Sequence, residues 1–145
     1  MKLVGLRRIA VVLVGAALLT ACRGAAADSG SGGTGPDGLR TVTIDIRFSK
    51  FSVGDLRMKP GETVRFVIRN HDPIPHEFIV GDMVVQDHHE KGTEAHHGDR
   101  PGEVSVAAGA TAETRYTFLS SGTLFFGCHL PGHWNYGMQG MITVA

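Results

Sequence analysis

Apolar and polar residues alternate with a period of two through most of the chain after residue 40. This alternation places apolar side chains on one face of each segment, which is typical of half-buried β-strands. Turn signals such as Pro60-Gly61 and Ser121-Gly122 separate the segments. The strand-like segments are 41–48, 63–69, 76–80, 103–106, 114–119, 123–128 and 140–144.

Seven or eight short strands in 105 residues, with no helical pattern among them, predict the fold class. Residues 41–145 are expected to form one all-β domain, a Greek-key β-sandwich. The stretch at about 82–102 interrupts the alternation, because it is polar and has little apolar periodicity. We expect most of it to be an insertion loop, and it contains four histidines: His88, His89, His96 and His97.

The first 21 residues have the pattern of a signal peptide. A basic start with Lys2, Arg7 and Arg8 precedes an apolar run of 12 residues from Ile9 to Thr20, which is too short to span a bilayer. The run ends in Leu-Thr-Ala-Cys, which resembles the bacterial lipobox and implies that Cys22 is acylated after residues 1–21 are removed. The alternative is ordinary cleavage in the small-residue stretch 25–27.

Residues 22–40 are rich in Gly, Ser, Ala and Asp, so they cannot form a core. We expect a flexible tether between the lipid and the domain. The protein is then exported and anchored on the outer side of the cytoplasmic membrane, or lies in the periplasm.

Charge excludes one class of partner. Removal of the signal peptide leaves 11 Lys and Arg against 14 Asp and Glu, a net charge of −3. Nothing in this mildly acidic balance points to nucleic acid.

Cysteine usage points to a metal. An exported protein usually pairs its thiols, but only Cys22 and Cys128 exist, and the first is expected to carry lipid. Cys128 would be a lone thiol in an oxidising compartment, where it is prone to oxidation. A bond to a metal ion removes that problem.

The segment from Cys128 to Met138 brings together a thiolate, the imidazole of His133 and the thioether of Met138. A mononuclear blue-copper centre uses these three groups and a second histidine. His76 is the candidate, because it shares its strand face with apolar Phe78 and therefore points inward.

At these residues the domain resembles a cupredoxin of the plastocyanin, azurin and auracyanin kind. The resemblance rests on the segment before His76 and on Cys-x4-His-x4-Met at Cys128, His133 and Met138. It implies one type 1 copper ion, with His76, Cys128 and His133 as equatorial ligands and Met138 as the axial one. One departure is Glu77, which stands where many members carry Asn or Ser.

Three alternatives to a single copper ion with these four ligands remain: a different axial methionine, a different metal, and a second copper site. Met141 competes with Met138 for the axial position, and zinc competes with copper. His129 directly after Cys128 resembles the end of multicopper oxidases, but Gly127 stands where that family has a histidine before the Cys. A nitrite-reductase-like assembly with a second copper between subunits is the third alternative.

The resemblance predicts a function as well as a fold. We expect a protein that carries single electrons in the cell envelope to a redox partner protein, and that is not an enzyme. Trp134 either contributes to the docking surface or packs over the copper loop. The alternative is a copper carrier or copper-resistance protein, in which His88, His89, His96 and His97 bind a second metal ion.

Overall fold

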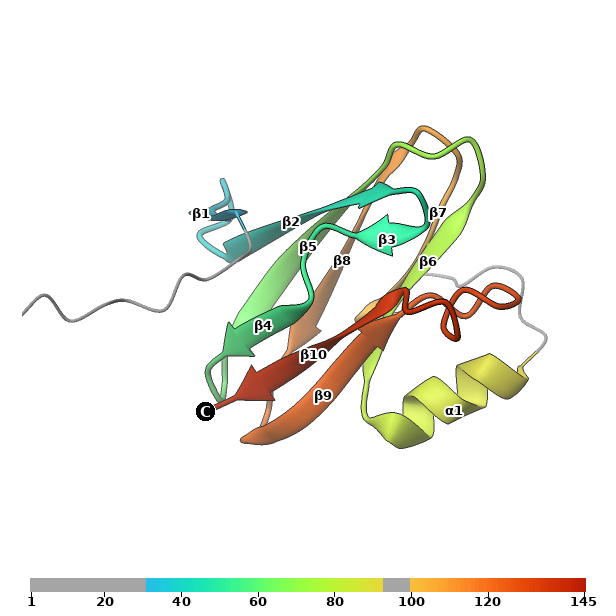
Figure 1. Ribbon diagram of the computed structural model, residues 1–145. Coiled ribbons are helices and arrows are strands. Elements are labelled where there is room, and N and C mark those ends of the chain that lie inside the picture. Colours follow the sequence, from blue (N-terminus) through green and yellow to red (C-terminus); the bar gives the residue numbers. More distant parts are fainter. Residues whose placement is uncertain (1–30, 93–99) are drawn as a thin grey trace, which may run out of the picture.

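The computed structural model describes residues 31–92 and 100–145, which form two packed β-sheets and one helix (Figure 1). The first sheet has the strand order β1-β2-β5-β8, and β3 pairs with β2. Its strands are β1 (Ser31–Thr34), β2 (Arg40–Arg47), β3 (Lys50–Phe51), β5 (Thr63–Asn70) and β8 (Thr111–Thr117). The second sheet has the order β4-β10-β9-β6-β7. Its strands are β4 (Asp55–Met58), β6 (His76–Gly81), β7 (Glu103–Val106), β9 (Gly122–Gly127) and β10 (Gln139–Val144).

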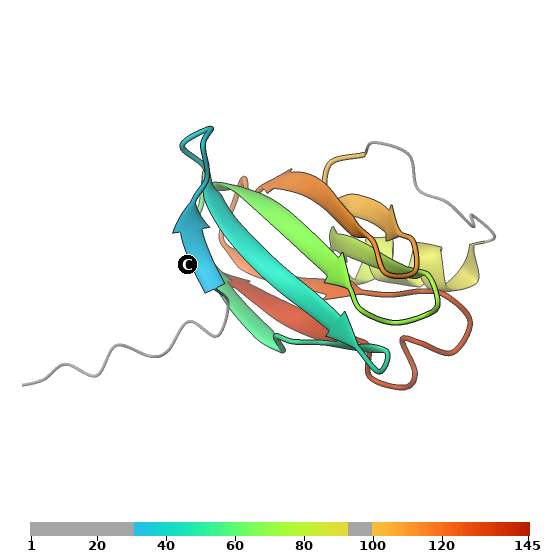
Figure 2. The ribbon, with the colours of Figure 1, turned by 90° about the horizontal axis from the view of Figure 1, so that it is seen from above.

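The all-β sandwich prediction is confirmed. Figure 2 shows the sheets as two layers, in which the pairs β2/β5 and β4/β10 are parallel and the other strand pairs are antiparallel. The described residues contain ten strands rather than seven or eight. The additional ones are β1, β3 and β4, which have only two to four residues each. Since β1 lies within the predicted tether 22–40 and pairs with β2, the tether prediction is wrong for those four residues.

The core lies between the layers and contains the apolar residues that the alternation selects. Val42, Ile44 and Ile46 of β2 are fully buried. Phe78 of β6 joins the two sheets, with ring centroids 5.1 Å from Phe66 and 5.4 Å from Phe126. Burial of such side chains is the main stabilising contribution to a domain of this size.

Phe48 is an exception to the alternation. The sequence pattern places it on the inward face of the first strand, but β2 ends at Arg47 and the Phe48 side chain is 91% exposed. Phe48 and Ser49 have left-handed backbone angles, with φ of 54° and 53°, so the chain turns before Phe48 can reach the core.

The expectation of a loop over most of 82–102 is wrong for residues 83–91, while residues 93–99 lie outside the described ranges. Residues Met83–Lys91 form helix α1, which packs against β6 and β9. Asp82 caps its first turn by accepting hydrogen bonds from the N–H groups of Val84 and Val85, both at 3.0 Å. Gln86 is the buried residue of this helix. The helix covers the outer side of β6, and for this reason Glu77 and Ile79 are buried although they alternate with the core residues.

Within the described ranges, no helix is long and apolar enough to cross a membrane. The predicted signal peptide, Cys22, His96 and His97 lie outside these ranges.

Candidate metal centre

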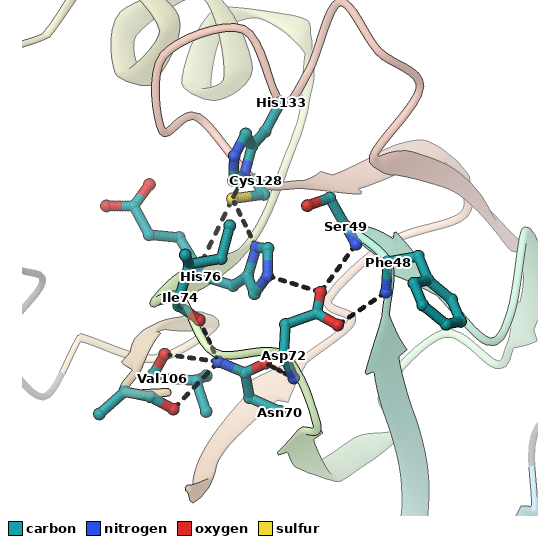
Figure 3. Close-up of polar contacts among 11 residues, drawn as sticks. Phe48, Ser49, Asn70, Asp72, Ile74, His76, Val106, Cys128 and His133 are labelled. Atoms are coloured by element: carbon teal, nitrogen blue, oxygen red, sulfur yellow. Dashed lines mark hydrogen bonds and ion pairs between the residues drawn. The ribbon is translucent and has the colours of Figure 1, made fainter. Parts of the chain in front are cut away.

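His76, Cys128 and His133 come together at one end of the sandwich. Their ligand atoms all lie within 4.8 Å of one another. Cys128 Sγ is 3.3 Å from His133 Nδ1 and 4.0 Å from His76 Nδ1, and the two imidazole centroids are 5.0 Å apart. Figure 3 shows both rings directed at the sulfur. Within residues 31–92 and 100–145, no other group of three or more His, Cys, Asp or Glu residues brings its ligand atoms this close together.

Neighbouring strands bring the first two ligands together. His76 begins β6 and Cys128 follows β9, and these strands are antiparallel neighbours in the second sheet. Both side chains are fully buried, whereas His133 is partly exposed. The thiol and one imidazole are therefore held by the core, and the other imidazole is carried by a loop.

We call residues 128–138 the ligand loop, and backbone hydrogen bonds close it on itself. Cys128 N–H donates to the Met138 carbonyl at 3.1 Å, and Met138 N–H donates to the His133 carbonyl at 3.0 Å. Gly132 and Gly137 both have φ of +84°, a conformation that favours glycine. Contacts within its own backbone thus hold the shape of the loop.

The two candidate methionines differ in burial. Met138 is fully buried in the core cluster that contains Cys128. Met141 is 39% exposed and lies within β10, three residues beyond the ligand loop. Burial therefore favours Met138 over Met141, and Met138 stays the predicted axial ligand.

Burial governs the protonation of the Cys128 thiol. Desolvation raises its pKa to about 11, although N–H groups of Glu77 and Leu130 favour the thiolate. The Glu77 N–H lies 3.3 Å from the sulfur, so this residue braces the site through its backbone. Burial also lowers the pKa of His76 and favours its neutral form, which is the form that binds metals.

His129 points away from the three ligands and toward α1. Its Nε2 lies 2.7 Å from Gln86 Oε1 and its Nδ1 lies 3.0 Å from Glu90 Oε2. The ring stacks on Trp134, with centroids 4.8 Å apart and planes at 17°. The His129 side chain is 2% exposed and ties the ligand loop to the helix. In the oxidase-like alternative, His129 would instead be a ligand of a further copper cluster.

The two described histidines of the polar stretch do not reach the Cys128 site. His88 is exposed, and its ring centroid is 5.8 Å from that of His89. His89 Nδ1 lies 2.8 Å from the Val85 carbonyl, and its Nε2 lies 3.6 Å from Glu103 Oε2.

Sequence patterns miss the polar residues that support the site. Asp72 contacts His76, and Gln86 and Glu90 contact His129. The available signals are weak: Asp72 lies four residues before His76, and Asp82 is a helix N-cap residue in front of Gln86 and Glu90.

The fold and the His-Cys-His group define a mononuclear copper protein. Residues 40–145 match the family described as copper binding proteins, plastocyanin/azurin family. The chain belongs to this family, and the cupredoxin prediction is confirmed.

Three relatives share the name copper-resistant cuproprotein CopI. The one from Rubrivivax gelatinosus is 37% identical over 110 residues, which cover 73% of this chain and 65% of the relative. The one from Pseudomonas aeruginosa is 31% identical over 137 residues, covering 72% of this chain and 76% of the relative. The one from Vibrio cholerae is 33% identical and is matched over 56% of its length. The chain thus spans only about two thirds of the Rubrivivax relative.

Solved structures with the same fold include two auracyanins. Auracyanin B superposes with a TM-score of 0.60 and 20% identity, covering 72% of this chain and 88% of the other. The reduced auracyanin of Roseiflexus castenholzii gives a TM-score of 0.62 and 21% identity, with 72% and 96% covered. Identities this low support the fold alone.

The donor set fits copper. One thiol and two imidazole nitrogens lie close together, and a buried thioether belongs to the same loop. Soft sulfur with imidazole is the ligand chemistry of copper, and a thioether is not a usual zinc ligand. The copper prediction is confirmed by this group and by the family.

Proposed function

We propose that this protein binds copper in the cell envelope and contributes to copper resistance. The observation that carries the proposal is the relatedness to three copper-resistant cuproproteins, at 31–37% identity. The electron-carrier function that the resemblance first suggested becomes the second candidate.

The proposed binding role follows from the state of the ligands. His76 and Cys128 are already buried side by side, so little rearrangement accompanies binding. With a pKa of about 11, the Cys128 thiol is protonated at neutral pH and must release its proton to become a ligand. Copper itself supplies a one-electron couple when bound.

Two features of the surface lie next to the site. His133 is partly exposed on the ligand loop. A pocket of about 240 Å³ opens beside His76, lined by Pro75, His76, Glu77, Ser105, Val106, Ala107 and Leu130. These openings suit an ion that must enter and leave.

We also propose export and a lipid anchor at Cys22, based on the lipobox resemblance. In Figures 1 and 2, β1 lies at the opposite end of the sandwich from the ligand loop. An anchor that leads into β1 would direct the copper site away from the membrane.

Growth in copper tests the resistance role. A copper-sensitive bacterial strain would express the full chain, its Cys128→Ala variant, or a control variant, Thr123→Ala, in the exposed part of β9. We expect the wild type and the control to raise the tolerated copper concentration several-fold and Cys128→Ala to give no protection. Equal growth of all strains, including one without the protein, would contradict the proposal.

The second candidate is single-electron transfer to a redox partner, without catalysis. It is favoured by the position of His133, which is partly exposed and has its Nδ1 3.3 Å from the buried Cys128 sulfur. Trp134 on the same loop would then contribute to docking. An intense thiolate-to-copper absorption with a reversible potential would support this candidate. A colourless protein that binds Cu(I) tightly would exclude it.

A further inference from the structure

Asp72 is the polar residue in closest contact with a ligand of the copper site. Its Oδ2 lies 3.0 Å from His76 Nε2 (Figure 3). The other nitrogen of the same ring, Nδ1, faces the Cys128 sulfur. Nδ1 is therefore the nitrogen available to the metal, and Nε2–H is the donor to the carboxylate. Such a carboxylate–histidine pair fixes the tautomer and the orientation of a ligand.

Asp72 is a charged acceptor in this contact. It receives the N–H of Phe48 on Oδ1 and the N–H of Ser49 on Oδ2, both at 2.7 Å. Together with the His76 ring, these donors converge on a carboxylate and favour its ionised form. An anion that accepts three donors has little freedom to move.

The turn that supplies two of these donors has an unfavourable backbone. Phe48 and Ser49 both have left-handed φ angles, which are disfavoured for residues with side chains. The Phe48 side chain is almost fully exposed, so packing does not explain the conformation. What the conformation does achieve is to direct two N–H groups at Asp72, and such strain often occurs at functional sites.

The loop that carries Asp72 is fixed from its other side as well. Asp72 N–H donates to Asn70 Oδ1 at 2.9 Å. The Asn70 amide in turn donates to the carbonyls of Ile74, Val106 and Ala107. The carboxylate is thus held between the β2–β3 turn and the loop before β6, with His76 as its third contact.

We propose that Asp72 is a positioning residue that orients His76 and makes the site favour Cu(II) over Cu(I). Its negative charge lies one imidazole ring away from the metal position and increases the electron donation of that ring. Cu(II) carries one more positive charge than Cu(I), so this carboxylate stabilises the oxidised ion more. The inference rests on copper binding at this site and not on the copper-resistance role, so the two can fail separately.

The rival explanation is that Asp72 only anchors the β2–β3 turn. In that case replacement of Asp72 would lower the affinities for Cu(I) and Cu(II) by the same factor, because the fold itself would be less stable. The two explanations differ in the ratio of the Cu(I) and Cu(II) affinities, which a purely structural role leaves unchanged.

The test compares Asp72→Asn with the wild type in the exported full chain, using competition for Cu(I) and for Cu(II) and the reduction potential. We expect the ratio of Cu(I) to Cu(II) affinity to rise about tenfold, which corresponds to a potential about 59 mV higher. The matched control is Asp45→Asn, because Asp45 pairs with His71 at 2.6 Å outside the ligand group. This control should leave the ratio unchanged.

One further measurement and one further variant keep the test decisive. In the copper-free protein, the His76 Nε2–H resonance should exchange slowly with solvent in the wild type and rapidly in Asp72→Asn. Asp72→Ser, a smaller neutral acceptor, serves as a second variant. An unchanged affinity ratio in a folded variant would overturn the proposal. Failure of both variants to fold would also overturn it, since Asp72 would then act through the fold.

Discussion

The imidazole of His129 lies flat on the indole of Trp134, with 4.8 Å between the ring centroids. This stack joins the residue after the Cys128 ligand to the residue after the His133 ligand. Gln86 and Glu90 of α1 hold the other polar contacts of the imidazole. The helix therefore supports the ligand loop from outside the sandwich, and Trp134 contributes to packing whether or not it also contacts a partner.

His129→Ala should loosen the ligand loop without removing copper. The variant loses one ring stack and two polar contacts, one of them partly buried, so we expect the free energy of unfolding to fall by about 1–3 kcal/mol. The thiolate-to-copper absorption should persist, because His129 lies outside the ligand group. Chemical denaturation and visible spectroscopy check the two parts. The control is His71→Ala, at a partly exposed histidine. If His129→Ala loses the absorption and His71→Ala keeps it, His129 belongs to the copper site and the prediction is wrong.

Gly127→Ala should destabilise the protein. A methyl group at this position would come within 3 Å of the Trp134 ring, so the ring or the strand end must shift. Overpacking of this kind costs about 1–3 kcal/mol. Gly54→Ala is the matched control, because a Cβ there meets no atom within 4 Å, and it should change the stability by less than about 0.5 kcal/mol. Equal stability of the two variants would contradict the close approach of Trp134 to the strand.

The copper-free protein should lose stability at alkaline pH. Burial raises the pKa of Cys128 to about 11 in the folded state, above its value in the unfolded chain. The associated stabilisation is therefore complete below about pH 8.5 and is lost as the pH rises toward 11, by up to about 3 kcal/mol. Denaturant titrations between pH 8 and 11 measure this loss. Cys128→Ala should lack this part of the pH dependence, and an identical profile in both proteins would contradict a buried thiol.

The histidines of the polar stretch should bind additional metal if the second-site prediction is right. Calorimetry on Cys128→Ala removes the main site and leaves any second binding event visible. We expect that event to disappear when His88, His89, His96 and His97 are all replaced by Ala. His71→Ala, on the Cys128→Ala background, should leave it unchanged. An unchanged stoichiometry in the fourfold variant would refute this prediction.

The sequence by itself determined the class of fold and the elements of the copper site. Alternation identified the strands around Val42 and Phe66, because a strand with one buried face has a period of two wherever it lies in the fold. The spacing from Cys128 to Met138 is likewise local, since one loop supplies three of the ligand types. His76 could be paired with that loop because the face of a strand follows from its sequence.

Only the tertiary structure decided how these parts are supported. Helix α1 has weak sequence signals because its stability comes from packing on β6 and β9, with Gln86 buried in the contact. The left-handed turn at Phe48 breaks an alternation that the sequence continues, since a distant carboxylate, Asp72, accepts its N–H groups. His129 looks like a free polar loop residue until the helix covers it. The Ser49–Asp72 contact and the His129–Glu90 contact join residues 23 and 39 positions apart, and local patterns carry no information about such contacts.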